Sequence, residues 1–286
     1  MTKNLKKEIF ITIDLEDIGN DYFRHLMGRN SDVDNTVYVH RSIDRLVEAL
    51  EPKVTGCKFT FFVTGDFVQR YGAVVKSLKE YGHEISCHYH YHDYFNRDDV
   101  YIAEKRLCNA IDLIHKHTGD YPLGFRAPRF SLTTSDLAHI ALLEKYFVYD
   151  SSIIITNNDE FKKLSGLTEA MKFIPLKAKT ILPGLNLKAG GSYMKVFPNK
   201  IWSLPLYDDQ IDLVNQVYIH PYELLFAQNF QLDWQKVQIP TLQKLQGLFG
   251  YYHRTKLMNW MWRTRLQYLR KKFTLSSKTL AETLYD

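Results

Sequence analysis

Residues 9–17 read IFITIDLED, an apolar and largely β-branched run that ends in three carboxylates. Such a short run predicts a buried β-strand, here over residues 8–14, with Asp14, Glu16 and Asp17 at its end. Similar runs elsewhere in the chain predict further strands at 57–63, 83–87, 121–127, 147–153 and 216–221.

Segments with helical spacing of apolar residues separate the predicted strands. Alternating strands and helices with short connections are typical of a parallel sheet covered by helices, so the sequence predicts an α/β fold. The helices are expected at 36–51, 67–82, 99–119 and 135–146, with Gly82 as the C-cap of the second and Ser135 or Thr134 as the N-cap of the last.

Polar clusters follow four of the predicted strands, at 14–17 (DLED), 88–92 (HYHYH), 126–129 (RAPR) and 220–221 (HP). In a parallel barrel the carboxyl ends of the strands form one rim, and the chemistry takes place there. An open dinucleotide-binding sheet is the alternative, but no G-x-G-x-x-G follows the first strand. The pattern therefore favours a barrel with its site at this rim.

The overall composition is that of an ordinary globular protein. The 286 residues are 45% apolar and 24% charged, which argues against disorder and allows one large domain or two small ones. No stretch approaches the roughly 20 apolar residues of a membrane-spanning helix. The first apolar run is too short for a signal peptide, and the three cysteines, without a C-x-x-C pair, are expected to be reduced. We therefore expect a cytoplasmic protein.

His88 and His92 are four residues apart, a spacing that places two imidazoles on one side of a helical turn. A hydrolytic zinc site commonly uses two histidines and one carboxylate and keeps one position for water. Asp14, Glu16 and Asp17 offer such a carboxylate, with another left over as a base. The alternative is a polar histidine-rich loop beside a solvated acidic cluster, which acids directly after an apolar strand make less attractive.

Seven motifs in order give the chain a family resemblance. It resembles the polysaccharide deacetylase superfamily (carbohydrate esterase family four), in particular a subgroup whose first motif is D-x-E-D or D-x-E-E. The similarity covers residues 8 to about 225, and residues 249–273 are similar to the basic helical extension of that subgroup. The motifs are ITIDLED (11–17), KFTFFVTG (58–65), GHEISCHYHYH (82–92), GFRAPRFSL (124–132), YDSSI (149–153), GGSYMKVFP (190–198) and YIHPYE (218–223).

The resemblance implies a distorted barrel of about seven strands and a metal-dependent hydrolase of acyl groups on sugars. It also implies roles for individual residues. His88 and His92 would bind Zn²⁺ or another divalent cation, Asp14 would be the general base, Arg126 would orient it, His220 would be the general acid, and the backbone N–H of Arg129 would bind the oxyanion.

Two positions depart from the family pattern. The usual carboxylate ligand directly follows the base, but that residue is Leu15 here, so Glu16 or Asp17 must replace it. No aspartate is obviously placed to partner His220. Tyr193, in the GGSYMK segment, would stack on a sugar ring, although structural packing of this loop tyrosine is equally compatible with the sequence.

Positive charge is concentrated near the C-terminus. Residues 234–281 contain ten lysines and arginines and no acid, although the whole chain has a net charge of only +5. We expect a barrel over 1–233 and a basic, aromatic helical extension over 234–286 that packs on it. The extension either presents a basic face to solvent or binds an anionic membrane surface. Nucleic acid is not expected as a partner, since no groove-reading motif is present.

The sequence thus predicts a cytoplasmic, metal-dependent deacetylase of an N-acetylated sugar, a precursor of a surface polysaccharide, with a peripheral place at the inner face of the membrane. Two alternatives stay open. One is a deformylase or amidohydrolase that acts on a lipid-linked sugar or a small amide. The other is a non-catalytic barrel that only binds carbohydrate. The sequence does not indicate an oligomeric state.

Overall fold

The computed structural model describes residues 6–209, 211, 213–225, 236–256 and 258–285. The domain boundary expected between residues 233 and 234 lies outside the described residues, so the division into barrel and extension stays a prediction. Among the described helices, none combines the length and the apolar composition that crossing a bilayer requires.

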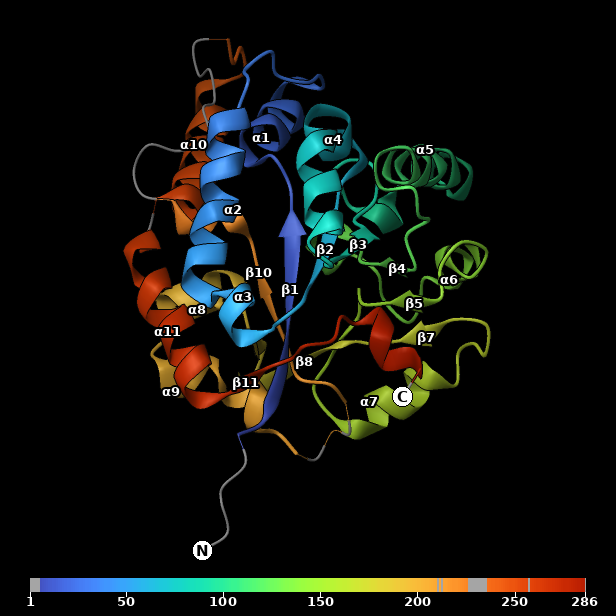
Figure 1. Cartoon of the computed structure of the whole chain (residues 1–286). Helices are drawn as coiled ribbons and strands as arrows, with labels where there is room; N and C mark the ends of the chain where they lie inside the picture. The colour runs from blue at the N-terminus through green and yellow to red at the C-terminus, as the bar shows by residue number, and fades with distance from the viewer. Residues whose placement is uncertain (1–5, 210, 212, 226–235, 257, 286) are drawn as a thin grey trace, which may run out of the picture.

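A curled, parallel β-sheet forms the centre of the molecule (Figure 1). Helices surround it, which confirms the predicted α/β fold of the distorted barrel type. The strands follow the order β10-β1-β2-β3-β4-β5-β7, and β11 pairs with β1. Their bounds are β1 Glu8–Leu15, β2 Phe59–Val63, β3 Glu84–Cys87, β4 Gly124–Phe125, β5 Tyr149–Asp150, β7 Lys172–Phe173, β10 Gln216–Ile219 and β11 Thr274–Leu275.

A smaller sheet contains β6 (Ile154–Ile155), β8 (Leu176–Leu182) and β9 (Leu185–Lys188), in the order β6-β8-β9. A bridge between Gly190 and Tyr218 joins the end of this sheet to β10. The sequence analysis did not predict these strands, because β8 and β9 mix lysine and asparagine with apolar residues.

The α-helices are α1 Ile18–Met27, α2 Thr36–Leu50, α3 Pro52–Thr55, α4 Gly65–Glu80, α5 Val100–Thr118, α6 Leu137–Leu143, α7 Asn158–Ser165, α8 Gly191–Val196, α9 Asn199–Trp202, α10 Thr241–Thr255 and α11 Trp262–Lys272. Short 3-10 helices are η1 Phe95–Arg97, η2 Pro128–Phe130, η3 Leu204–Tyr207, η4 Pro221–Leu224, η5 Asn259–Met261 and η6 Ala281–Tyr285.

Strands β1 and β2 are continuous apolar runs because both faces of the sheet are covered. Every residue of β2 is buried, and in β1 only Glu8 is exposed. Buried parallel strands characteristically show such runs in place of alternation. The register of the two strands places Asp14 opposite Phe62 and Leu15 opposite Val63, so the acidic end of β1 lies at the same rim as the end of β2.

Two predicted strands are much shorter in the structure. The runs 121–127 and 147–153 form only the two-residue strands β4 and β5. The chain leaves the sheet after Phe125 and Asp150, because side-chain hydrogen bonds link the residues that follow the two strands. Arg126 donates to the carbonyl and the hydroxyl of Ser151, and the amide of Ala127 donates to the Ser152 hydroxyl. The strand ends thereby build the polar network of the site.

The predicted N-cap of α6 is wrong, and the predicted C-cap of α4 is one residue too far along the chain. Neither Ser135 nor Thr134 caps α6; the N-cap position is Asp136, whose carboxylate accepts hydrogen bonds from Thr133 and not from the helix. Tyr81 holds the C-cap position of α4, and Gly82 follows it with φ +83°, a left-handed conformation that favours glycine.

The C-terminal segment is built into the fold and is not purely helical. Helix α10 contacts α1, and α11 contacts α2. Strand β11 then pairs with the start of β1, which the sequence analysis did not predict. Trp262, Leu266 and Phe273 are part of the main hydrophobic core. Figure 1 shows α10 beside α1 at the end towards which β1 points.

Candidate active site

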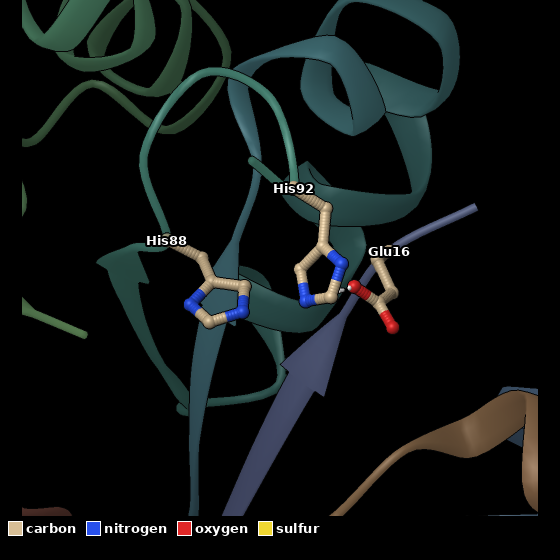
Figure 2. Close-up of side chains that lie close together, drawn as sticks. All are labelled: Glu16, His88 and His92. Atoms are coloured by element: carbon tan, nitrogen blue, oxygen red, sulfur yellow. Dashed lines mark ion pairs between the residues drawn. The ribbon is translucent and has the colours of Figure 1, made fainter. Parts of the chain in front are cut away.

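Three of the predicted ligands lie together at the rim of the sheet. Glu16 follows β1, His88 follows β3, and His92 lies four residues further in the same loop (Figure 2). All three are buried, and one ligand atom from each lies within 4.8 Å of the others. Glu16 Oε2 is 2.8 Å from His92 Nε2. This group has the composition and the spacing that a metal ion requires.

The histidines meet through a loop and not through a helical turn, so the expected helical geometry is wrong. Residues 90–93 form bends, and Tyr89 has φ +64°. The amides of Gly65 and Asp66 at the start of α4 donate to the carbonyls of Tyr89 and His90 and hold the loop in place. A Cβ on Gly65 would lie 2.4 Å from His90 Nδ1, so the loop packs against α4 only because residue 65 is glycine.

The protonation state of His88 follows from its contact with a backbone carbonyl. Its Nδ1 is 2.7 Å from the carbonyl oxygen of Arg126, which can only accept a hydrogen bond, so Nδ1 carries the proton. Nε2 is then unprotonated, and its lone pair is available to bind a metal. Burial lowers the pKa of His88 to about 4, which keeps the ring neutral. A neutral, oriented imidazole is the form that ligates a metal.

The carboxylate of Glu16 fits a bound cation. Both of its oxygens are buried, and neither accepts a hydrogen bond of good geometry from a described residue. A buried carboxylate without such partners is costly. A divalent cation held between Glu16 and the two imidazoles would satisfy it.

Asp17, the other candidate ligand, has a structural position. Its Oδ1 accepts hydrogen bonds from the backbone amides of Gly19 and Asn20, each at 3.1 Å, and so caps α1. Asn35 donates to the same oxygen at 2.9 Å, and the Tyr71 hydroxyl donates to Oδ2 at 2.7 Å. The structure therefore brings Glu16, and not Asp17, to the histidines. Alternation along an extended chain, which puts residues 14 and 16 on one side, is the sequence signal for this.

Arg126 holds Asp14 in a fully buried network. Its Nη1 donates to Asp14 Oδ1 at 2.8 Å and to Thr12 Oγ1 at 3.0 Å. Its Nη2 donates to Ser151 Oγ and to Gln216 Oε1, and the guanidinium lies 4.1 Å from the centre of the Phe62 ring. Burial alone would raise the pKa of Asp14, but the charge of Arg126, together with its hydrogen bond and the nearby His220, holds the pKa below its usual range.

His220 lies between two carboxylates. Its Nε2 is 3.9 Å from Asp14 Oδ2, and its Nδ1 is 3.4 Å from Glu223 Oε2. Burial would lower the pKa of His220, but the hydrogen bond and the charge of Glu223 raise it above its usual value. Glu223 is thus the acidic partner that the sequence analysis did not find. Its position three residues after His220, in YIHPYE, was the available signal.

Lys195 connects this pair to the C-terminal segment. Its buried ammonium is 3.4 Å from Glu223 Oε1 and donates to the carbonyls of His253 and Arg254 at the end of α10. Burial would raise the pKa of Glu223, but Lys195 and His220 lower it, so Glu223 stays ionised.

The remaining predicted residues are Arg129 and Tyr193. Arg129 has φ +60° within η2, and its guanidinium lies 4.9 Å from the centre of the Tyr94 ring. Tyr193 lies in α8, where its ring stacks on Phe197 with 6.2 Å between centres. The structure places Arg129 at the pocket described next, and Tyr193 is not one of that pocket's lining residues.

A pocket of about 360 Å³ lies beside the candidate metal ligands. His92 and Arg129 line it on one side, α1 contributes Asp21 and Tyr22, and α10 contributes Arg254. The sequence analysis did not expect α10 at the site, since no pattern within 241–255 indicates which helix it contacts.

Comparisons with known proteins agree with this architecture. A family model described as polysaccharide deacetylase matches residues 34–144, which include His88, His92 and Arg126. The chain is 28% identical over 150 residues to the Peptidoglycan deacetylase-like protein FGM2 of Gibberella zeae, an alignment that covers 51% of this chain and 44% of that protein. The matched region thus spans less than half the length of this relative.

Two solved structures share the fold. One is a putative polysaccharide deacetylase from Mycobacterium smegmatis, with a TM-score of 0.55, 14% identity and coverage of 100% of this chain and 91% of that chain. The other is Puue Allantoinase, with a TM-score of 0.55, 12% identity and coverage of 99% and 90%. The D-x-E-D subgroup stays a prediction. The family model and the relative agree with the resemblance to the polysaccharide deacetylase superfamily, and the two solved structures show that the chain has a fold found in that superfamily.

Proposed function

We propose that the protein is a metal-dependent deacetylase that removes the acetyl group from an N-acetylated sugar. The observation that carries the proposal is the buried carboxylate of Glu16, which accepts no hydrogen bond of good geometry from a described residue and lies beside two imidazoles. The similarity to polysaccharide deacetylases supports deacetylation as the reaction.

Glu16, His88 and His92 would hold the metal, Zn²⁺ or another divalent cation. When bound, such an ion would supply Lewis-acid chemistry, that is, polarisation of the acetyl carbonyl and a lowered pKa of water. Asp14, kept ionised by Arg126, accepts the proton of the attacking water. His220 then donates a proton to the departing amine, which would otherwise be a poor leaving group.

Glu223 supports this role of His220 because its negative charge favours the protonated imidazole. The backbone N–H of Arg129 would stabilise the developing oxyanion, and Tyr193 would stack on a sugar ring; both roles are carried over from the family resemblance. The surface-polysaccharide precursor as substrate rests on the same resemblance.

Helix α10 favours a peripheral place at a membrane. A surface helix usually turns its apolar face to the core. On α10 only Tyr251 among the apolar side chains is buried, against Tyr22 of α1, and the rest of the α1 side consists of glycines, glutamines and Arg254. Leu242 and Phe249 are 69% and 73% exposed. The exposed apolar residues of this helix are Leu242, Leu245, Leu248, Phe249 and Tyr252.

The occupant that we propose for this surface is an anionic bilayer. No acid occurs between residues 234 and 281, and Lys256, Arg263 and Lys271 are exposed. Apolar insertion and attraction to anionic headgroups act together in such helices. The three free cysteines, Cys57, Cys87 and Cys108, suit a reducing compartment, so we place the protein at the inner face of the membrane.

Acetate release from a panel of acetylated sugars tests the proposed function. The wild type should release acetate from an N-acetylated sugar faster than it releases formate from the N-formyl analogue. Faster release of formate would support the deformylase alternative. Binding of a sugar without release of either acid, in protein loaded with zinc, would show a carbohydrate-binding barrel and overturn the proposal.

A further inference from the structure

The pocket between α1 and α10 contains two arginines without an acceptor. Among the described arginines that are not exposed, Arg129 and Arg254 alone form no ion pair and no hydrogen bond through the guanidinium. The others pair with a carboxylate, as Arg126 does with Asp14 and Arg270 with Glu51, or donate to a carbonyl, as Arg265 does to Met194. The two exceptions line one pocket.

Aromatic rings are the only groups among the described residues that contact these two guanidinium groups directly, although the charges of Glu16 and Glu223 act on Arg254 from further away. The guanidinium of Arg129 lies 4.9 Å from the centre of the Tyr94 ring, and its Nε is buried without a hydrogen-bond partner. The guanidinium of Arg254 lies 5.9 Å from the centre of the Tyr22 ring. Stacking orients a guanidinium and leaves its N–H groups free to bind an acceptor.

The acid in the same pocket does not neutralise these charges. Asp21 lines the pocket, but no ion pair joins it to either arginine. Burial, together with the nearby negative charges of Glu16 and Asp17, raises the pKa of Asp21 well above its usual value.

We propose that this pocket binds the phosphate of a sugar substrate that is linked through a phosphate or diphosphate ester. The inference rests on the proposed function and adds the substrate class. The guanidinium fork matches a phosphate, and a dianion is the ligand that two unpaired arginines favour. His92, a candidate metal ligand, lines the same pocket, so a sugar bound by its phosphate there lies next to the candidate active site.

The volume and the construction of the pocket agree with this ligand. About 360 Å³ lies within the range of small-molecule sites. Helix α10 approaches α1 closely because Gly247 and Gly250 face it: a Cβ on Gly250 would lie 3.0 Å from the Tyr22 hydroxyl. The close approach of the two helices keeps Arg254 at the pocket.

Equilibrium titration of two probes tests the subsite independently of catalysis. The probes are N-acetylglucosamine 1-phosphate and N-acetylglucosamine, each titrated into the zinc-loaded and the metal-free protein. The wild type should bind the phosphorylated sugar at least about tenfold more tightly in both forms, since a hydrogen bond to a charged group contributes this much. Arg254→Gln should abolish the difference, and Arg254→Lys should keep part of it.

Arg263→Gln, which removes an exposed cation of the same segment, is the matched control and should bind as the wild type does. Equal affinity of the wild type for both probes, or unchanged preference in Arg254→Gln, would overturn the subsite. Phosphate preference without acetate release from any sugar would leave the subsite standing and refute the proposed function. Acetate release without phosphate preference would support the proposed function and refute the subsite.

Two further substrates distinguish the sources of the phosphate. One is a nucleoside-diphosphate N-acetylglucosamine, and the other is a polyprenyl-diphosphate N-acetylglucosamine in detergent. A KM lower for either one than for the methyl glycoside of N-acetylglucosamine, with the advantage lost in Arg254→Gln, supports the proposal and identifies the source. No advantage for either would contradict it.

Discussion

At the scale of single residues, substitution of Asp14 distinguishes proton transfer from metal binding. It contacts Arg126 at 2.8 Å and does not belong to the group of candidate ligands. We expect Asp14→Asn to keep the metal and to lower kcat by about 10²–10⁴-fold, the usual contribution of a general base. Metal analysis and acetate release on the same preparation check this. An emptied site in Asp14→Asn would show that Asp14 is a ligand.

Glu223 sets the pH range in which His220 can donate a proton. The rate should fall as the pH rises through the pKa of His220, because only the protonated ring is an acid. Glu223 raises this pKa. Glu223→Gln removes the negative charge, so the high-pH limb of the kcat profile should move to lower pH, by about one unit. Glu48→Gln, at an exposed position, is the control. An unmoved limb in Glu223→Gln would contradict the role.

The sequence predicted residue types better than residue geometry. The D-x-E-D motif left Glu16 and Asp17 open, because both are acids next to a strand end. The structure separates them through contacts from distant segments: Asn35 and Tyr71 bind Asp17, whereas His92 lies beside Glu16. Such contacts depend on the tertiary fold. Glu223 was missed although it is local, since its significance depends on Lys195, 28 residues away along the chain.

At the scale of elements, the loop of His88 and His92 depends on the first residue of α4. A Cβ on Gly65 would meet His90 Nδ1 at 2.4 Å and Ala110 at 3.0 Å. We expect Gly65→Ala to destabilise the protein by about 1–3 kcal/mol, the usual cost of overpacking, and to weaken zinc binding. Gly166→Ala is the control, since a Cβ there has ordinary contacts at 3.6 Å. Denaturant unfolding and zinc titration measure both effects; equal behaviour of the two variants would refute this account of the loop.

Helix α10 is the element that should contact the bilayer. Replacing Leu245 and Phe249 by serine should weaken co-sedimentation with anionic liposomes at least about fivefold, because buried apolar area and headgroup attraction add. Val54→Ser with Tyr81→Ser, which removes two apolar side chains elsewhere that are also more than half exposed, should have no effect. Binding should also weaken with added salt.

The structure shows which cations are suitable for replacement in this test. Arg265 is buried and donates to the Met194 carbonyl, and Arg270 forms a two-pronged pair with Glu51, so both stabilise the fold. Lys256 and Arg263 are exposed and are the cations to replace. No binding of the wild type to anionic liposomes at low salt would refute the membrane proposal.

At the scale of the whole molecule, the sequence predicted the parallel sheet and the rim that carries the site. The apolar runs of β1 and β2 and the amphipathic α2, α4 and α5 are local signals, and the structure confirms them. Strands β4 and β5 are shorter than predicted because Arg126, Ser151 and Ser152 use their hydrogen bonds within the site. The pairing of β11 with β1 joins residues more than 260 positions apart and leaves no local signal.

The metal content of matched variants tests the central claim most directly. Purified wild type, loaded with zinc and dialysed, should retain about one equivalent per chain. Glu16→Gln keeps the shape of the side chain and removes its charge, so it should lose the metal, as His88→Ala should. Asp17→Asn should retain it, because asparagine also caps a helix. A metal-replete Glu16→Gln beside a metal-free Asp17→Asn would contradict the account.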